Sequence, residues 1–313
     1  MQTLANQSGA SVATMSGCPA SGETHAVGEV TIFSGAIKLL FLNHELASQI
    51  EDDMRQGNQQ LVDAWRAADS NSTVQVLQLD GVLAVYGGPG CPVNEAVGLG
   101  MSHSIDGETL TQVEEFYESN RHPTVIRVCP LAHPSLIKTL QNRNYVLSSF
   151  AYRWVLDLQT WDPPHLHEVD PRVREATVDE EITWARTVAA GFIDAEDVPD
   201  GYDLGLYRAF FRMKSSIPVI AIDNGQPAAG GVIALNGEVA ALFATSTRPS
   251  YRKHGLQTAM LDWRLHIAKE HGARIATIET DPDSNSQRNV ERAGFRLAYV
   301  AVQMTRAYKH SEA

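Results

Sequence analysis

The residues of this sequence best suited to chemistry lie at positions 252–257, which read RKHGLQ. Arg252 and Lys253 supply positive charge, and Gly255 permits an unusual dihedral and a close approach of the backbone to a ligand. A strand-like run precedes the segment and a helix-like run follows it. The unpaired first amides of that helix, at the positive end of its dipole, would therefore face the turn. The segment is predicted to bind an anion, with a basic turn that holds no ligand as the alternative.

Other phosphate loops, metal sites and disulfides do not fit the sequence. A P-loop needs G-x-x-x-x-G-K-[ST] and a dinucleotide-binding turn needs G-x-G-x-x-G, and neither pattern occurs. His44-Glu45 has no second histidine at zinc-binding spacing, and His165 and His167 are expected to be solvent-exposed, so no metal is predicted. The cysteines are odd in number and widely spaced, which favours a reducing compartment. They are Cys18, Cys91 and Cys129.

Hydrophobic periodicity indicates the elements that position this turn. Apolar residues at helical spacing predict helices at 37–67, 108–120, 179–190, from Leu256 to the capping Gly272, and at 286–292. Apolar or alternating runs predict strands at 74–79, 82–86, 217–222, 230–235, 239–246, 274–280 and 295–304. The aromatic stretch from Tyr202 to Phe211 is equally compatible with core packing and with a cover over a binding pocket.

Composition limits the class of protein. The 313 residues are 43% hydrophobic and carry a formal net charge of −12, which disfavours nucleic acid or an anionic membrane as the main partner. No run approaches the roughly 20 apolar residues of a membrane helix, and no secretory signal starts the chain, so a cytoplasmic protein is expected. Residues 1–28 are expected to be a flexible tail, and the proline-rich segment 161–171 a linker.

An internal repeat divides the chain. Residues 124–154 overlay on 274–304 without a gap, and the apolar positions of the last strand alternate in phase in both copies. Such agreement predicts two related lobes, although two unrelated stretches of similar pattern would be the alternative. The segment 150 residues before YRKHGLQ reads MSHSIDG (101–107), which contains neither arginine nor lysine. Only the second lobe is therefore expected to carry the phosphate-binding turn.

The order of motifs in the second lobe resembles the GNAT acyltransferases. R-x-x-G-x-Q is similar to the family's R-x-x-G-x-[GA] turn, RIATIET (274–280) to its fifth strand, and SQRNVERAGF (286–295) to its fourth helix. The resemblance covers residues 170–306 and extends to bacterial two-lobed members. It implies an α/β (α+β) fold with two GNAT-like lobes, each a mixed, mostly antiparallel sheet flanked by helices. The expected domains are a degenerate lobe at 29–160 and an acyl-CoA-binding lobe at 172–313.

The resemblance also implies which residues hold acetyl-CoA. The turn would bind the pyrophosphate, the fourth strand would pair with the pantetheine arm, and the start of the fourth helix would reach the same ligand or only cap the helix. The residues concerned are Leu242, Phe243, Ala244, Thr245, Arg252, Lys253, His254, Gly255, Leu256, Gln257, Thr258, Asp283, Ser286 and Asn289. The chemistry implied is transfer of acetyl to an amine by direct attack in a ternary complex.

Two positions depart from the family pattern. Gln257 replaces a small residue in the turn, and Val290 stands where the family often has a tyrosine that acts as the general acid. Tyr299 or water would then supply the proton, and Glu279 would act as the base, unless it is only a solvated carboxylate.

The sequence therefore predicts an N-acetyltransferase with acetyl-CoA as co-substrate. The predicted partner is a small-molecule or peptide amine, and a homodimer is compatible with these features. Val290 motivates the alternative of a catalytically weak acyl-CoA sensor or scaffold.

Overall fold

The computed structural model describes residues 40–69, 71–162 and 169–308. The tail expected at 1–28 and most of the linker expected at 161–171 lie outside these ranges. All of the described residues belong to one compact unit, Leu39–Ala313. We call its described residues before 161 the first lobe and those from 169 onward the second lobe.

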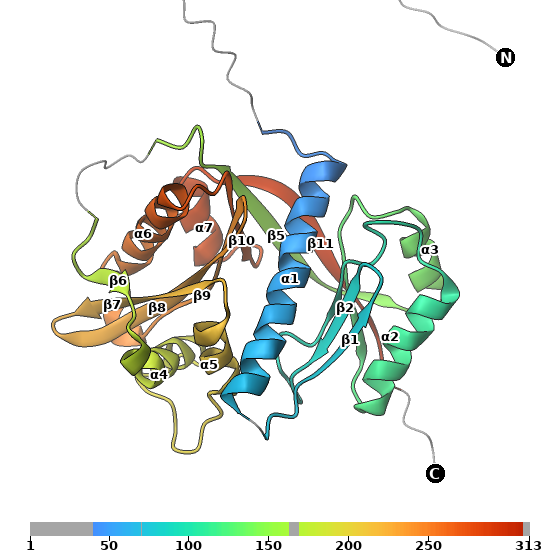
Figure 1. Ribbon diagram of the computed structural model, residues 1–313, viewed down its shortest axis with the longest axis horizontal. Helices are drawn as coiled ribbons and strands as arrows, with labels where there is room; N and C mark the ends of the chain where they lie inside the picture. Colours follow the sequence, from blue (N-terminus) through green and yellow to red (C-terminus); the bar gives the residue numbers. More distant parts are fainter. Residues whose placement is uncertain (1–39, 70, 163–168, 309–313) are drawn as a thin grey trace, which may run out of the picture. The chain divides into compact units, whose positions relative to one another are not determined.

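A single eleven-stranded sheet runs through both lobes, in the order β1-β2-β3-β4-β11-β5-β10-β9-β8-β7-β6 (Figure 1). Most neighbouring strands are antiparallel, but β3 is parallel to β4 and β9 is parallel to β10. The strands are β1 (Gln75–Leu79), β2 (Val82–Tyr86), β3 (Ala96–Val97), β4 (Thr124–Val128), β5 (Val146–Asp157), β6 (Val173–Glu175), β7 (Ser216–Asp223), β8 (Gln226–Asn236), β9 (Val239–Thr247), β10 (Ile275–Thr280) and β11 (Arg296–Arg306).

Helices cover both faces of the sheet. α1, α4 and α5 pack on one face, and the other four α-helices pack on the opposite face. The α-helices are α1 (His44–Ala68), α2 (Gly107–Ser119), α3 (Ser135–Asn142), α4 (Glu181–Phe192), α5 (Gly205–Arg212), α6 (Leu256–Glu270) and α7 (Asn285–Arg292); short 3₁₀ turns are η1 (Val178–Glu180) and η2 (Pro249–Tyr251). Figure 1 shows α1 running between β1 and β2 on one side and the second-lobe strands on the other, and its main helical partner is α5.

The internal repeat is visible in the structure. α3 and α7 begin and end 150 residues apart, and each is followed by a long strand, β5 or β11. These two strands are exchanged between the lobes, because β5 pairs with β10 of the second lobe while β11 pairs with β4 of the first. β5 and β11 also pair with each other. The sheet is therefore not divided at 161–171, where the sequence predicts the boundary between the domains.

Some predicted bounds need correction. The helix expected at 37–67 begins at His44, because the Asn43 side chain accepts a hydrogen bond from the Leu46 amide at 2.8 Å and so caps the helix there. The aromatic stretch contains α5, whose Phe211 is buried, while Tyr207 is half-buried. The expected mixed fold with sheets flanked by helices is confirmed.

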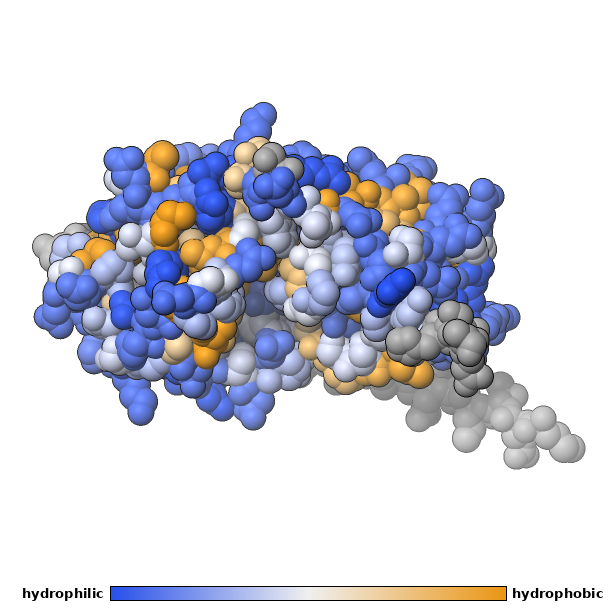
Figure 2. Space-filling view, turned by 90° about the horizontal axis from the view of Figure 1, so that it is seen from below, coloured by the Kyte–Doolittle hydropathy of each residue, from blue (hydrophilic) through white to orange (hydrophobic). Residues whose placement is uncertain are grey.

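The surface shown in Figure 2 is mostly hydrophilic, with separate hydrophobic patches. Among the described residues, no helix combines the length and the apolar character that a bilayer-spanning segment requires.

Candidate acyl-CoA site

The predicted anion-binding turn joins β9, through η2, to the first turn of α6. Lys253 and Gly255 have φ angles of 66° and 79°, both in the left-handed region. Gly255 is the N-cap residue of α6, and its lack of a side chain leaves the helix without a side-chain cap. A Cβ on Gly255 would meet nothing within 4 Å, so the backbone dihedral, rather than lack of space, favours glycine here. The first amides of α6 thus receive no side-chain cap, and whether they bind a ligand stays a prediction.

Two basic side chains of the turn, those of Arg252 and His254, contact other groups of the protein. Arg252 donates to the Thr247 and Gly191 carbonyls at 3.1 and 3.3 Å and forms an ion pair with Asp194 at 2.5 Å. The guanidinium thus connects the turn to the segment that follows α4. His254 contacts the Asp223 carboxylate through Nδ1 at 2.9 Å, which orients it toward β7.

The side chain of Lys253 is exposed, as are those of Arg252, His254 and Thr258, whereas Leu256 is buried in the core. Two of the predicted pyrophosphate ligands, Arg252 and His254, therefore already have acidic partners within the protein.

The start of α7 differs from the expectation. Ser284 is the N-cap residue, accepting from the Gln287 amide at 3.0 Å, whereas the sequence predicts a cap from Asp283, Ser286 or Asn289. Asp283 instead pairs with Arg288 at the surface. Asn289 donates to the Gln257 side chain at 3.2 Å. Gln257, the departure from the small residue of the motif, therefore links α6 to α7.

β9 and β10 are paired only over their first four residues. Their parallel pairing runs from Ile275 opposite Val239 to Ile278 opposite Leu242 and stops there, although both strands continue. At the same point the register between β8 and β9 shifts, because Gly231 lies opposite a bulge. Ala244 in this bulge has a φ of 49°. The edge of β9 from Phe243 to Thr245 is therefore not paired with β10, and we call this unpaired edge the opening.

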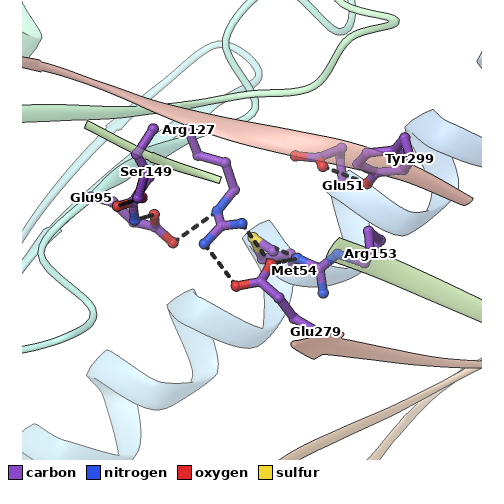
Figure 3. Close-up of polar contacts among 9 residues, drawn as sticks. Glu51, Met54, Glu95, Arg127, Ser149, Arg153, Glu279 and Tyr299 are labelled. Atoms are coloured by element: carbon purple, nitrogen blue, oxygen red, sulfur yellow. Dashed lines mark hydrogen bonds and ion pairs between the residues drawn. The ribbon is translucent and has the colours of Figure 1, made fainter. Parts of the chain in front are cut away.

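A buried ionic network lies beside this opening (Figure 3). The Glu279 carboxylate, on β10, forms ion pairs with Arg127 of β4 at 2.5 Å and with Arg153 of β5 at 2.9 Å. Arg127 also donates to Glu95 at 3.0 Å. The side chain of Glu279 is 31% exposed, whereas those of Arg127 and Arg153 are 6% and 9% exposed. Glu279 is therefore the member of the network with the most access to the surface.

The two arginines change what Glu279 can do. Burial raises the pKa of this carboxyl, but the charges and hydrogen bonds of Arg153 and Arg127 outweigh it and hold the pKa below its usual value. A carboxylate with a lowered pKa stays ionised and accepts a proton reluctantly, whereas an effective general base has a pKa close to the working pH. Glu279 is thus better suited to stabilising positive charge than to abstracting a proton.

Tyr299 does not lie at the opening. Its hydroxyl donates to Glu51 of α1 at 2.5 Å, and its side chain is packed in the core beneath α1. β11, which carries it, is separated from β10 by β5. Burial and the neighbouring Glu51 charge raise its pKa well above the ordinary tyrosine value. The geometry therefore argues against Tyr299 as the acid, and Val290, 1% exposed in the core, supplies none.

One known family matches the part of the chain that contains this site. The model of the Acetyltransferase (GNAT) family matches residues 181–295, which include β7 to β10, the turn, α6 and α7. Residues 181–295 therefore form a GNAT-family domain. A search of curated protein sequences gives no significant match.

Solved GNAT structures share the fold over both lobes. A GCN5-related N-acetyltransferase from Kribbella flavida is 16% identical, with a TM-score of 0.58, covering 85% of this chain and 97% of its own. A tandem GNAT protein from the clavulanic acid biosynthesis pathway is 15% identical, with a TM-score of 0.56, covering 87% and 98%. A GCN5-related N-acetyltransferase from Sphaerobacter thermophilus is 16% identical, with a TM-score of 0.50 and 76% coverage of both chains.

The first lobe contributes residues to the candidate site that the sequence motifs do not single out. They are Glu95, Arg127 and Arg153, and Glu51 on α1 joins the same buried region through Tyr299. The sequence does contain a feature that could have identified the two arginines, because Arg127 and Arg153 interrupt the apolar strands TVIRV and AYRWVL. Arginine is rarely buried without a partner. No metal-binding cluster of histidine, cysteine or acidic side chains occurs in the described part of the chain.

Proposed function

We propose that this protein is an N-acetyltransferase that transfers acetyl from acetyl-CoA to an amine. The observation that carries the proposal is the separation of β9 and β10 at Leu242 and Ile278, with the bulge at Ala244 leading into the uncapped start of α6. An extended arm fits the open strand edge, and a pyrophosphate fits the helix N-terminus.

Each part of the site has a defined task in this proposal. The first amides of α6 hold the pyrophosphate, with Lys253 adding charge, and the free backbone of β9 holds the pantetheine arm. A backbone amide of the bulge donates to the thioester carbonyl as negative charge develops on its oxygen. Acetyl-CoA supplies an activated acyl group: the amine nitrogen forms a bond to the thioester carbon, and the carbon–sulfur bond breaks to release the thiolate.

Glu279 acts on the amine side of the reaction. The attacking nitrogen becomes positively charged in the transition state, and a nearby ionised carboxylate stabilises that charge. The proton then leaves through water, because the lowered pKa makes Glu279 itself a weak acceptor. Water likewise protonates the departing thiolate in this scheme, since Tyr299 and Val290 are buried in the core.

The acceptor is an amine with access to Glu279. The net charge of −12 and the exposed edge of Glu279 favour an acceptor that arrives as an ammonium ion and loses one proton to water before its neutral nitrogen attacks. A small-molecule amine and a peptide amine both meet this requirement. We place the reaction in the cytoplasm, as the cysteine pattern suggests.

Two measurements test the proposal. Calorimetry with acetyl-CoA and with CoA should show binding of both, with one ligand per chain. Thiol release from acetyl-CoA should then rise when an acceptor from a panel of amines is present. Failure of both ligands to bind would remove the proposal, whereas binding without thiol release on any amine would restrict the protein to a binding role.

A further inference from the structure

A buried arginine on α6 lies behind the bulge that borders the opening. Arg264 is 1% exposed, and among the described residues no carboxylate forms an ion pair with it. Burial alone lowers its pKa to about 9. A buried cation without a counter-charge is costly, so the neutral groups around it must supply its stabilisation.

The guanidinium makes three hydrogen bonds, two of which go to the bulge region. Nε donates to the Met260 carbonyl at 3.0 Å within α6. Nη1 donates to the Val232 carbonyl of β8 at 3.1 Å and to the Thr245 hydroxyl of β9 at 2.7 Å. The Thr245 hydroxyl in turn donates to the Phe243 carbonyl at 3.3 Å. The charge of Arg264 is thus connected, through one hydroxyl, to the peptide group that joins Phe243 to Ala244.

That peptide group lies in the stretch of β9 that β10 leaves unpaired. In a trans peptide the N–H points opposite to the C=O, so the Ala244 N–H points away from the oxygen that Thr245 contacts. The pairing with β10 has already ended at Leu242, so that side of β9 is open. A hydrogen bond accepted by a peptide carbonyl polarises the whole group and makes its N–H a stronger donor.

The chain also leaves room for this arrangement. A Cβ built on Gly231 would lie 2.9 Å from the Thr245 hydroxyl oxygen and 3.2 Å from Arg264 Nη1. Gly231 has no left-handed backbone conformation, so space rather than dihedral freedom favours glycine at this position.

We propose that Arg264 is a positioning and polarising residue for acetyl transfer. It acts through the Thr245 hydroxyl and the Phe243 carbonyl on the Ala244 N–H, which donates a hydrogen bond to the thioester oxygen. The inference rests on the proposed acetyltransferase function. The relay strengthens the donor just as negative charge develops on the thioester oxygen, while the site for the pyrophosphate is untouched. Its loss should therefore lower kcat more than the affinity for CoA.

The test compares Thr245→Val, which removes the hydroxyl, with Thr245→Ser, which keeps it. In the wild type, the carbonyl stretch of acetyl-CoA labelled with carbon-13 should move to lower wavenumber on binding, as measured by difference infrared spectroscopy. Thr245→Val should reduce that shift and lower kcat about ten-fold, with the Kd of CoA changed less than about two-fold. Thr245→Ser should retain most of both. Arg264→Met should resemble Thr245→Val, and Arg264→Lys should fall between Arg264→Met and the wild type.

Each outcome separates the relay from the function on which it rests. A wild-type protein that fails to bind acetyl-CoA would overturn both. Equal infrared shifts and equal kcat for Thr245→Val and Thr245→Ser would overturn the relay alone. The relay is also wrong if Thr245→Val lowers the affinity for free CoA by as large a factor as it lowers kcat, because that would indicate a structural role. The threonine pair decides the matter even where Arg264→Met does not fold.

Discussion

The helices α2 and α6 occupy equivalent places in the two lobes, and their first turns differ in one decisive respect. α6 begins at Gly255 with no side-chain cap. α2 begins after Asp106, whose carboxylate accepts from the Thr109 amide at 2.7 Å, and Glu108 follows in the first turn. These backbone contacts lower the pKa of Asp106, so the carboxylate stays ionised. In the first lobe the helix is capped by a carboxylate of its own chain, and in the second no side chain caps the helix, which is where we propose that the pyrophosphate binds.

The difference separates the tasks that we propose for the two lobes. The first lobe has also shortened the strand before the helix to the two residues of β3, where β9 has nine. In return it supplies Glu95 and Arg127, which with Arg153 of the exchanged strand β5 hold Glu279. The first lobe is therefore part of the proposed acceptor site, although its own helix terminus is closed to phosphate.

The largest effect is expected when this contribution is removed. Arg127→Met leaves Glu95 buried without its partner and should cost about 3–5 kcal/mol of unfolding free energy near neutral pH. Denaturant unfolding measures the loss, with exposed Lys138→Met as the control. Arg127 lowers the pKa of Glu279, so its contribution is present above the usual carboxyl pKa and is lost as the pH falls through the lowered value. The gap between variant and wild type should close in acid. A gap that is the same at all pH values would contradict an ionic origin.

A second variant transfers the feature of the first lobe to the second. Gly255→Asp places a carboxylate at the start of α6. It should lower the affinity for CoA about 100-fold, because the carboxylate repels the pyrophosphate and competes with it for the first amides of the helix. Calorimetry measures the Kd. Gly237→Asp is the matched control, because Gly237 also has a positive φ and open space around its Cβ position. Unchanged CoA binding in Gly255→Asp would place the pyrophosphate elsewhere.

A smaller effect is expected at Arg252. Arg252→Ala should raise the Kd of CoA about ten-fold. The Kd of pantetheine, which lacks the pyrophosphate, should change by less than about two-fold. Asp194→Asn provides the counterpart, since it frees the guanidinium from its ion pair and should strengthen CoA slightly. Equal losses for CoA and pantetheine in Arg252→Ala would assign this arginine to bracing the turn.

The smallest effect is expected from removing the side-chain cap of α2 in the first lobe. Asp106→Ala should lower the Tm by roughly 2 °C through loss of the cap. The stoichiometry should remain one CoA per chain, because the first lobe also lacks the strand edge and the basic turn. A second bound CoA, detected by calorimetry, would show that the acidic cap alone separates the two lobes.

Much of the fold can be predicted from local pattern. The limits predicted for β2 match the structure, and the apolar spacing that begins at Leu256 predicts α6. Gly255 could be predicted as the turn residue before α6, because a glycine between a strand and a helix is recognisable from the adjacent residues. Such features depend on neighbours in sequence.

The parts that could not be predicted depend on distant pairing. β5 and β11 alternate in phase, so the sequence pattern is the same whether each strand stays in its own lobe or is exchanged. Arg127 meets Glu279 across 152 positions, and only the sheet order brings them together. The prediction of Glu279 as a base rests on its place at a strand end, which does not reveal its arginine partners. The bulge at Ala244 has no glycine or proline to announce it.

The exchange of β5 and β11 also has a consequence for how the protein folds during its synthesis. A chain is synthesised from its N-terminus, and separate domains ordinarily fold as they emerge. Here the first lobe lacks its neighbour to β4 until β11, which follows all the other strands in the chain order, has been synthesised. Neither half can complete its sheet alone, so the two halves are interlocked partners. Two fragments produced by cutting the chain within 161–171 should each need the other, and together should reassemble without the link.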